Sequence, residues 1–294
     1  MVDLLSGITV IGGKSSDILA KKLAKNLKAS FVSSEVKIFP DGESKITISA
    51  KPKGRVIVVN STYPPVDSNL IQILSLISKA KQSAREVVCV IPYMGYARQD
   101  REFLPGEIVT LSVIAKLLSS AGASKIIVVD MHSMLGAELF KIPIKNVSAV
   151  PELANYLKKL KLKDPIVISP DLGGKERAAE FAKFYGTDYI ALKKQRDRKT
   201  GRVQIMTEHL DYVKGRDLVI VDDMISTGGS IVKATQFLKK QKCGKIVVAC
   251  THALLIDNAE KKIKNAGVSA IISTNTIPGS TSFVDVSGII AKAI

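Results

Sequence analysis

The chain has 294 residues, of which 46% are hydrophobic and 24% are charged, and this length accommodates two ordinary globular domains, each with its own core. No segment of the sequence approaches the roughly 18 uninterrupted apolar residues of a membrane span, and the N-terminus lacks a signal-peptide pattern. We therefore expect a cytoplasmic protein with no membrane partner.

The formal net charge of +16 and the pI of about 9.6 indicate an anionic partner. Nucleic acid is the first candidate, but many lysines follow polar helix faces, where contact with water explains them. Lys21, Lys22, Lys25 and Lys28 are examples. Aromatic residues make up 5% of the chain and Trp is absent, so we expect no base-stacking platform and no nucleic acid partner. A polyphosphate substrate would use the same positive field.

Apolar, strand-like runs alternate with segments of helical period along most of the chain. This order is typical of an α/β fold with mainly parallel sheets. The helical period is found at 17–28, 68–81 and 108–121. The strand-like runs are 56–59, 87–91, 126–129, 166–169, 219–221 and 246–250.

The first glycine-rich loop, Gly12-Gly13-Lys14-Ser15, invites comparison with the nucleotide P-loop pattern GxxxxGK[ST]. Counting back from Gly13 places Ile8 where the first glycine of that pattern belongs, and a β-branched residue obstructs the tight turn. A P-loop kinase is therefore disfavoured. We expect this loop to cap the helix that follows it.

Three polar clusters follow predicted strands, at the edge where open α/β sheets bind ligands. In YARQDR, Arg98 and Arg101 flank Gln99 and offer charge-assisted hydrogen bonds to phosphates. His132 lies in DMHS, and Asp171 precedes two glycines in SPDLGGKER. A purely structural role for His132 is the alternative. Together, however, His132 and Asp171 make a sparse set of nitrogen and oxygen donors. Such a set suits Mg²⁺, which keeps several waters and is completed by substrate phosphates.

The basic run KKQRDRKTGR, residues 193–202, predicts a β-hairpin loop. Basic runs of this kind are more often solvent-exposed turns without a binding role. Beside Mg²⁺ and polyphosphate, the same loop would close over a substrate, neutralise developing charge and exclude water.

The segment VIVDDMISTGGSI, residues 219–231, predicts a site for a phosphorylated sugar. A buried strand at 219–221 and helical spacing from Ile231 leave a turn at 226–230. Gly228 and Gly229 allow positive φ, so successive N–H groups can point at an anion beside the positive end of a helix. An ordinary glycine-rich βα turn is the alternative. Further hydrogen bonds would come from the hydroxyls of Ser226, Thr227 and Ser230.

Two adjacent acids, Asp222 and Asp223, stand directly before this loop. Their carboxylates would repel a phosphate, but they can accept hydrogen bonds from neighbouring sugar hydroxyls. The acidic pair therefore favours a sugar phosphate over a plain anion.

An internal repeat supports two similar halves. The segment GRVIVVNSTYPPVDSNLIQILSLI from Gly54 resembles GRDLVIVDDMISTGGSIVKATQFL from Gly215, although any two βα units share this order. Only the second copy has the acidic pair and the glycines. We predict domains over 1–145 and 146–294, with a degenerate phosphate loop in the first, the sugar site in the second, and the last residues packing on the first domain.

Together, the motifs FPDGE, YARQDR, DMHS, SPD and VDD resemble the ribose-phosphate pyrophosphokinases, or phosphoribosyl pyrophosphate (PRPP) synthetases, along essentially the whole chain. The resemblance implies two similar phosphoribosyltransferase-type α/β domains, each a mainly parallel sheet flanked by helices. It also implies ATP and ribose 5-phosphate as substrates, Mg²⁺ as cofactor, and a homo-oligomer, dimer or higher, with adenine bound at a subunit interface.

The resemblance also implies roles for individual residues. ATP would be bound by Phe39, Asp41, Glu43, Arg98, Gln99, Arg101 and His132, and the metal by His132 and Asp171. Lys194 and Arg196 would support the transition state from a mobile loop. Ribose 5-phosphate would be bound by Asp222, Asp223, Ser226, Thr227, Gly228, Gly229 and Ser230.

The implied reaction is transfer of the diphosphoryl group of ATP to the C1 hydroxyl of ribose 5-phosphate, giving PRPP and AMP. A nucleobase phosphoribosyltransferase would use the same sugar loop, but it leaves YARQDR and FPDGE unexplained. A non-catalytic regulatory subunit associated with PRPP synthetases is the other alternative. The presence of Lys194, Arg196, His132 and Asp171 counts against it.

Overall fold

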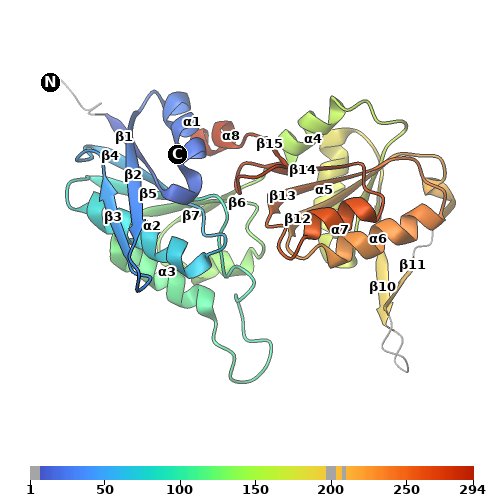
Figure 1. Cartoon of the computed structure of the whole chain (residues 1–294), viewed down its shortest axis with the longest axis horizontal. Coiled ribbons are helices and arrows are strands. Elements are labelled where there is room, and N and C mark those ends of the chain that lie inside the picture. Colours follow the sequence, from blue (N-terminus) through green and yellow to red (C-terminus); the bar gives the residue numbers. More distant parts are fainter. Residues whose placement is uncertain (1–6, 197–202, 207–209) are drawn as a thin grey trace. The chain divides into compact units, whose positions relative to one another are not determined.

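Alternating strands and helices build two α/β units (Figure 1). The structure is a computed structural model that describes residues 7–196, 203–206 and 210–294, with the backbone alone at 194–196, 203–206 and 210. The first unit comprises the described chain up to Ser148 with Asn275–Pro278 and Asp285–Ile294. The second comprises Ala149–Thr274 and Gly279–Val284. Among the helices described, none has the length and apolar character needed to cross a membrane.

The sheet of the first unit has, within the described residues, the order β3-β2-β1-β4-β5-β6-β7. Neighbouring strands are parallel except β2 and β3, which pair antiparallel as a hairpin. The strands are β1 (Ile8–Gly12), β2 (Ser30–Ile38), β3 (Ser44–Ile48), β4 (Arg55–Val59), β5 (Glu86–Ile91), β6 (Lys125–Val129) and β7 (Ile144–Val147).

Helices cover both faces of this first sheet because the strand order reverses between β1 and β4. Right-handed crossovers then place the helix after β1 on one face and the helices after β4 and β5 on the other. Accordingly α1 packs against α8, and α2 packs against α3 (Figure 1). These helices are α1 (Asp17–Leu27), α2 (Val66–Lys81), α3 (Thr110–Ala121) and α8 (Ser287–Ala291), with short 3₁₀ turns at Lys14–Ser16 and Leu135–Leu139.

The described sheet of the second unit has the order β15-β14-β13-β12-β8-β9, with parallel neighbours, beside a separate antiparallel pair, β10 and β11. Its strands are β8 (Ile166–Ser169), β9 (Tyr189–Ala191), β10 (Lys193–Arg196), β11 (Val203–Met206), β12 (Leu218–Ile225), β13 (Ile246–Ala253), β14 (Ala270–Thr274) and β15 (Ser282–Val284). Its helices are α4 (Val150–Lys158), α5 (Lys175–Tyr185), α6 (Gly229–Lys240) and α7 (Ala259–Asn265), with 3₁₀ turns at Leu172–Gly174 and Leu210–Val213.

The two units share one connectivity. In chain order and in sheet position, β1, β2, β4, β5, β6 and β7 correspond to β8, β9, β12, β13, β14 and β15. In the second unit α4 packs against α5 and α6 against α7. The predicted fold class, two similar α/β domains with mainly parallel sheets flanked by helices, is therefore confirmed.

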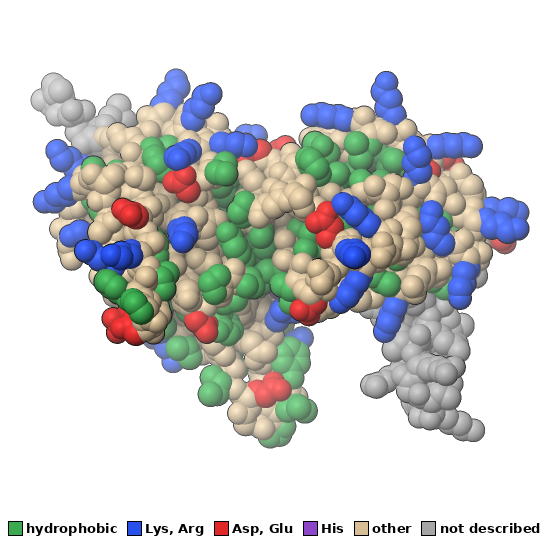
Figure 2. All heavy atoms as spheres, in the orientation of Figure 1, with side chains coloured by type: hydrophobic (Ala, Val, Ile, Leu, Met, Phe, Trp, Pro, Cys, Tyr) green, Lys and Arg blue, Asp and Glu red, His purple; other side chains and the backbone are tan. Residues whose placement is uncertain are grey.

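Each unit has its own apolar core between sheet and helices. In the first, Val56 and Val58 of β4 are buried with Ile73 and Ile77 of α2. In the second, the buried set includes Ile220 of β12, Val248 of β13 and Leu238 of α6. These near-continuous apolar strands are typical of sheets covered on both faces. Lysine and arginine side chains are spread over the surface of each unit in the view of Figure 2.

Candidate functional site

The predicted sugar loop follows β12 in the second unit. The strand continues through both acids to Ile225, and α6 begins at Gly229. The predicted strand end at Val221 is therefore wrong. Of the two glycines that allow a positive φ, Gly228 has one, +74°, and Gly229 does not. Ser230 lies in the first turn of the helix rather than in the loop.

The two glycines of the loop have different surroundings. A Cβ atom on Gly228 would lie 2.9 Å from Cδ1 of Ile263, whereas a Cβ atom on Gly229 would meet nothing within 4 Å. The start of α6 thus packs closely on α7 at Gly228 and faces open space at Gly229. The positive end of the helix dipole lies at this start of α6, which suits an anion.

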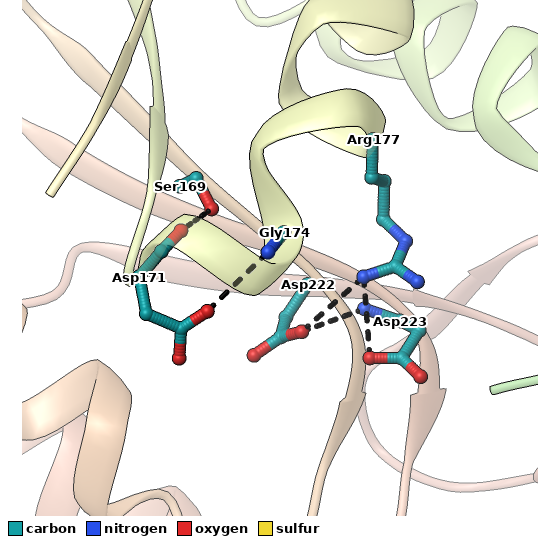
Figure 3. Close-up of polar contacts among 6 residues, drawn as sticks. All are labelled: Ser169, Asp171, Gly174, Arg177, Asp222 and Asp223. Carbon is teal, nitrogen blue, oxygen red and sulfur yellow. Dashed lines mark hydrogen bonds and ion pairs between the residues drawn. The ribbon is translucent and has the colours of Figure 1, made fainter. Parts of the chain in front are cut away.

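Both acids of the pair contact the guanidinium of Arg177 on α5 (Figure 3). Arg177 Nη1 lies 3.5 Å from Asp222 Oδ1 and 3.3 Å from Asp223 Oδ1. The Asp222 side chain is 25% exposed and the Asp223 side chain 5%. Burial, with the neighbouring carboxylate of Asp223, raises the pKa of Asp222 well above its usual range, while Arg177 opposes this rise.

Asp171 lies at the start of the 3₁₀ turn that leads into α5 (Figure 3). Its Oδ1 accepts a hydrogen bond from the Gly174 N–H at 3.3 Å, and its carbonyl accepts one from Ser169 Oγ at 2.6 Å. Asp171 therefore belongs to a small cap that also fixes the first turn of α5, from which Arg177 projects.

The predicted phosphate-binding residues of the first unit follow β5. Arg98, Gln99 and Arg101 are exposed, while Asp100 between them is buried. The Arg101 guanidinium lies 4.9 Å from the centre of the Phe103 ring. The buried residue thus anchors a loop whose neighbouring side chains face solvent.

His132 lies on the next loop, which follows β6. It is exposed, and the backbone before it is fixed because the Met131 N–H donates to Asn146 Oδ1 at 2.9 Å. Ser133 Oγ donates to Asp100 Oδ2 at 2.5 Å. Since β5 and β6 are neighbours in the sheet, the structure brings the YARQDR and DMHS loops together. Asp130 takes a positive φ of 38° at this strand end, a strained geometry that is common at binding sites.

Sequence reasoning assigned no role to Asp100 or Arg177. Asp100 stands between two predicted ATP-binding residues, and Arg177 follows the glycines of SPDLGGKER. Their positions inside these motifs could have singled them out as candidates. Their contacts could not be predicted, because their partners, Ser133 and the acidic pair, lie on other strands and loops.

Phe39, Asp41 and Glu43 lie at the tip of the β2–β3 hairpin. The turn is closed by hydrogen bonds from the Phe39 N–H to the Glu43 carbonyl at 2.8 Å and from the Glu43 N–H to Asp41 Oδ1 at 3.1 Å. All three side chains are exposed. Within the first unit they form a protruding edge rather than an enclosed adenine pocket.

Lys194 and Arg196 belong to β10, which pairs antiparallel with β11, so that Lys194 is opposite Ile205 and Arg196 opposite Val203. This pairing agrees with the hairpin expected from the basic run. The side chains of both residues, and residues 197–202 of that run, lie outside the described part of the chain.

The loop after β4, which corresponds to the sugar loop, is filled by its own side chains. Asn60 Oδ1 accepts hydrogen bonds from the Ser15 N–H at 3.2 Å and from Ser15 Oγ at 2.7 Å. A Cβ atom on Gly13 would lie 2.2 Å from Asn60 Oδ1. Ser16 stands at the start of α1 but its side chain makes no capping hydrogen bond. The Ser16 hydroxyl instead accepts from the Ser61 N–H, so the expected cap is wrong in this respect.

The predicted Mg²⁺ ligands belong to different units, His132 to the first and Asp171 to the second. Over the ranges that the structure describes, no group of three or more His, Cys, Asp or Glu side chains is placed to hold a metal ion. Each of the two side chains offers a donor atom that Mg²⁺ can combine with waters and substrate phosphate oxygens.

Known proteins that are similar in sequence and structure carry the same family name that the motifs indicate. Residues 8–122 match the family described as the N-terminal domain of ribose phosphate pyrophosphokinase, and residues 199–294 match the phosphoribosyl synthetase-associated domain. The ribose-phosphate pyrophosphokinase of Methanopyrus kandleri is 40% identical over 278 residues, 94% of each chain. That of Sulfolobus acidocaldarius is 36% identical over 97% of this chain and 99% of its own.

A solved structure, the phosphoribosylpyrophosphate synthetase from Mycobacterium smegmatis, superposes with a TM-score of 0.85 at 26% identity. The match covers 98% of this chain and 97% of that chain. It therefore includes both units and the connections between their strands. From these matches, and from the motifs on the loops described above, the chain belongs to the ribose-phosphate pyrophosphokinase family.

Proposed function

We propose that this protein transfers the β,γ-diphosphoryl group of ATP to the C1 hydroxyl of ribose 5-phosphate, releasing AMP and forming PRPP. The observation that carries the proposal is family membership over nearly the whole chain. The two alternatives, a nucleobase phosphoribosyltransferase and a non-catalytic subunit, are not favoured by these relatives.

Ribose 5-phosphate is assigned to the loop after β12. The open space at Gly229 and the positive end of the α6 dipole suit the 5-phosphate. Ser226, Thr227 and Ser230 would add hydroxyl donors. Asp222, held by Arg177, can accept hydrogen bonds from the ribose hydroxyls through its carboxylate.

ATP is assigned to the first unit. Arg98, Gln99, Arg101 and His132 stand on the two loops that the Asp100–Ser133 hydrogen bond joins, and cationic side chains there would bind the phosphates. Phe39 would stack on adenine, and Asp41 or Glu43 would accept from its amino group. Because these three side chains lie exposed at a hairpin tip, we propose that a second copy of the chain completes the pocket in a homo-oligomer.

The C1 oxygen of the sugar attacks the β-phosphorus, a bond forms between them, and the bond from the β-phosphorus to the oxygen of AMP breaks. Such phosphoryl transfer needs little covalent chemistry from the protein, so positioning and charge neutralisation carry the catalysis. We assign the neutralising charges to Lys194 and Arg196 on the β10–β11 hairpin. Their substitution by alanine is expected to lower kcat while sugar-phosphate binding is retained.

Mg²⁺ is the cofactor that the sparse donor set favours, with His132 and Asp171 as its protein ligands. When bound with ATP, the ion would offset the negative charge of the phosphate oxygens. Cap residues around Asp171 hold its carboxylate in a defined orientation. We further propose a cytoplasmic location and a first domain, 1–145, whose own phosphate loop is degenerate and which binds ATP, beside a sugar-binding domain, 146–294.

The experiment is a chromatographic assay for AMP and PRPP with ATP, Mg²⁺ and ribose 5-phosphate, each omitted in turn. Formation of both products in equal amounts only when all three are present supports the proposal. Consumption of added PRPP with a nucleobase, without AMP formation from ATP, would instead assign the chain to the transferases.

A further inference from the structure

Arg177 is the cation that joins the two candidate loops of the second unit. It projects from the first turn of α5, after the Asp171 cap, and reaches the acidic pair on β12 (Figure 3). We infer that Arg177 is a positioning residue for ribose 5-phosphate, because it holds Asp222 and Asp223 ionised and oriented for the sugar hydroxyls. This inference rests on the proposed function of the same site.

Geometry supports a shared contact rather than a simple ion pair. One guanidinium nitrogen, Nη1, lies 3.5 Å from Asp222 Oδ1 and 3.3 Å from Asp223 Oδ1. Asp222 Oδ1 also accepts the Asp223 N–H at 2.9 Å. Both carboxylates are therefore fixed at their Oδ1 atoms, and the Asp222 side chain retains enough exposure, 25%, to meet a ligand.

The electrostatics of the pair require a counter-ion. Two adjacent carboxylates, one nearly buried, repel each other and favour sharing a proton. The group opposite Asp222 on β13 is Cys250, whose thiol is buried and has a pKa raised by that burial and by both aspartates, so it supplies no positive charge. The Arg177 side chain, 24% exposed, supplies it from α5.

Protonation of Asp222 would change its chemistry toward the sugar. An ionised carboxylate accepts hydrogen bonds with both oxygens, whereas a protonated one must donate with one of them. Loss of Arg177 should therefore weaken sugar binding most at acid pH and least at alkaline pH. A direct contact between Arg177 and a phosphate of ATP makes a different prediction, since it would raise KM for ATP instead.

Three variants separate these roles. Arg177→Gln removes the charge, Arg177→Lys keeps it without the planar fork, and Lys183→Gln removes an exposed charge from the same helix as a matched control. Ribose 5-phosphate binding is measured by calorimetry without ATP, from mildly acid to mildly alkaline pH. KM and kcat for both substrates are measured in parallel, and circular dichroism checks the fold.

For Arg177→Gln we expect ribose 5-phosphate affinity at neutral pH to fall by about tenfold or more, as a one-unit rise in a carboxyl pKa implies. The acid limb of its binding profile should move up by about one to three pH units. KM for the sugar should rise more than kcat falls. Arg177→Lys should recover much of the affinity, and Lys183→Gln should behave as the wild type.

An unchanged pH profile in Arg177→Gln would overturn the inference, as would a rise in KM confined to ATP. If Arg177→Gln does not fold, the acid limb of the Arg177→Lys binding profile decides. A variant that binds ribose 5-phosphate more weakly, but with the same pH dependence as the wild type, would contradict the inference. A wild type that binds ribose 5-phosphate but forms no PRPP removes the proposed reaction and leaves the inference standing. A wild type that binds no ribose 5-phosphate overturns both.

Discussion

The carboxylate of Asp100 accepts a hydrogen bond from Ser133 Oγ at 2.5 Å, and this contact joins the loops after β5 and β6. Asp100 is 9% exposed, whereas Arg98, Gln99 and His132 around it face solvent. This part-buried contact thus links the two loops that present the side chains we assign to ATP.

Ser133→Ala tests whether this contact positions the ATP-binding side chains. The change leaves a buried carboxylate one donor short, which costs about 1–3 kcal/mol of unfolding free energy. KM for ATP should rise as the two loops separate. Urea unfolding and steady-state kinetics measure both effects, with Ser78→Ala on the exposed face of α2 as the control. Wild-type stability together with wild-type KM would contradict the assignment.

Gly228→Ala tests the packing of the sugar loop. The residue has φ +74°, and its Cβ would lie 2.9 Å from Ile263 Cδ1. We expect a loss of about 1–3 kcal/mol in stability, together with weakened ribose 5-phosphate binding because the loop must shift. Gly229→Ala is the matched stability control, since its Cβ meets nothing within 4 Å. Thermal unfolding that ranks the two variants equally would sink this explanation.

Asp222→Asn should separate stability from binding. Burial raises the folded-state pKa of Asp222 above its unfolded value, so the native protein loses stability as pH rises through that raised pKa. At neutral pH the asparagine variant should therefore be at least as stable as the wild type, and this advantage should vanish as pH falls below the ordinary aspartate range. Ribose 5-phosphate binding should nevertheless be lost.

Unfolding of Asp222→Asn as a function of pH gives the measurement, and Asp188→Asn, at an exposed position, is its control. A variant that is less stable than the wild type at neutral pH would show that Asp222 is held mainly by favourable ion pairing.

Asp171→Asn tests the metal assignment. Asparagine keeps the oxygen that accepts the Gly174 N–H, so the fold of the cap should survive, but it removes the negative charge. We expect the Mg²⁺ concentration for half-maximal activity to rise by at least about tenfold. A Mg²⁺ titration of initial rates tests this, and an unchanged midpoint with unchanged stability would assign Asp171 to the cap alone.

Much of the fold was accessible from the sequence because the parallel strands are buried on both faces. The runs at 56–59, 87–91, 126–129 and 246–250 are near-continuous in apolar residues and occur within β4, β5, β6 and β13. The repeat from Gly54 and Gly215 also corresponds to equivalent strands, β4 and β12. Helix starts were less accurate, by two residues in α2 and α3, because neither helix has a side-chain cap.

The candidate site was predicted motif by motif, but contacts between motifs were not. Asp222 and Asp223 read as a strand end because charged residues seldom continue a buried strand. However, β12 stays paired with β13 as far as Ile225, and Arg177 accompanies the two acids. Similarly, nothing in the spacing of Asp100 and Ser133 predicts their hydrogen bond. It depends on β5 and β6 being neighbours in the sheet.

The origin of each atom in the product would decide the reaction. With ribose 5-phosphate carrying ¹⁸O on C1, ATP and Mg²⁺, we predict by ³¹P NMR that the label bridges C1 and phosphorus in PRPP and that AMP contains none. Label in AMP or in free phosphate, or ADP as the nucleotide product, would contradict attack of the sugar oxygen on the β-phosphorus of ATP.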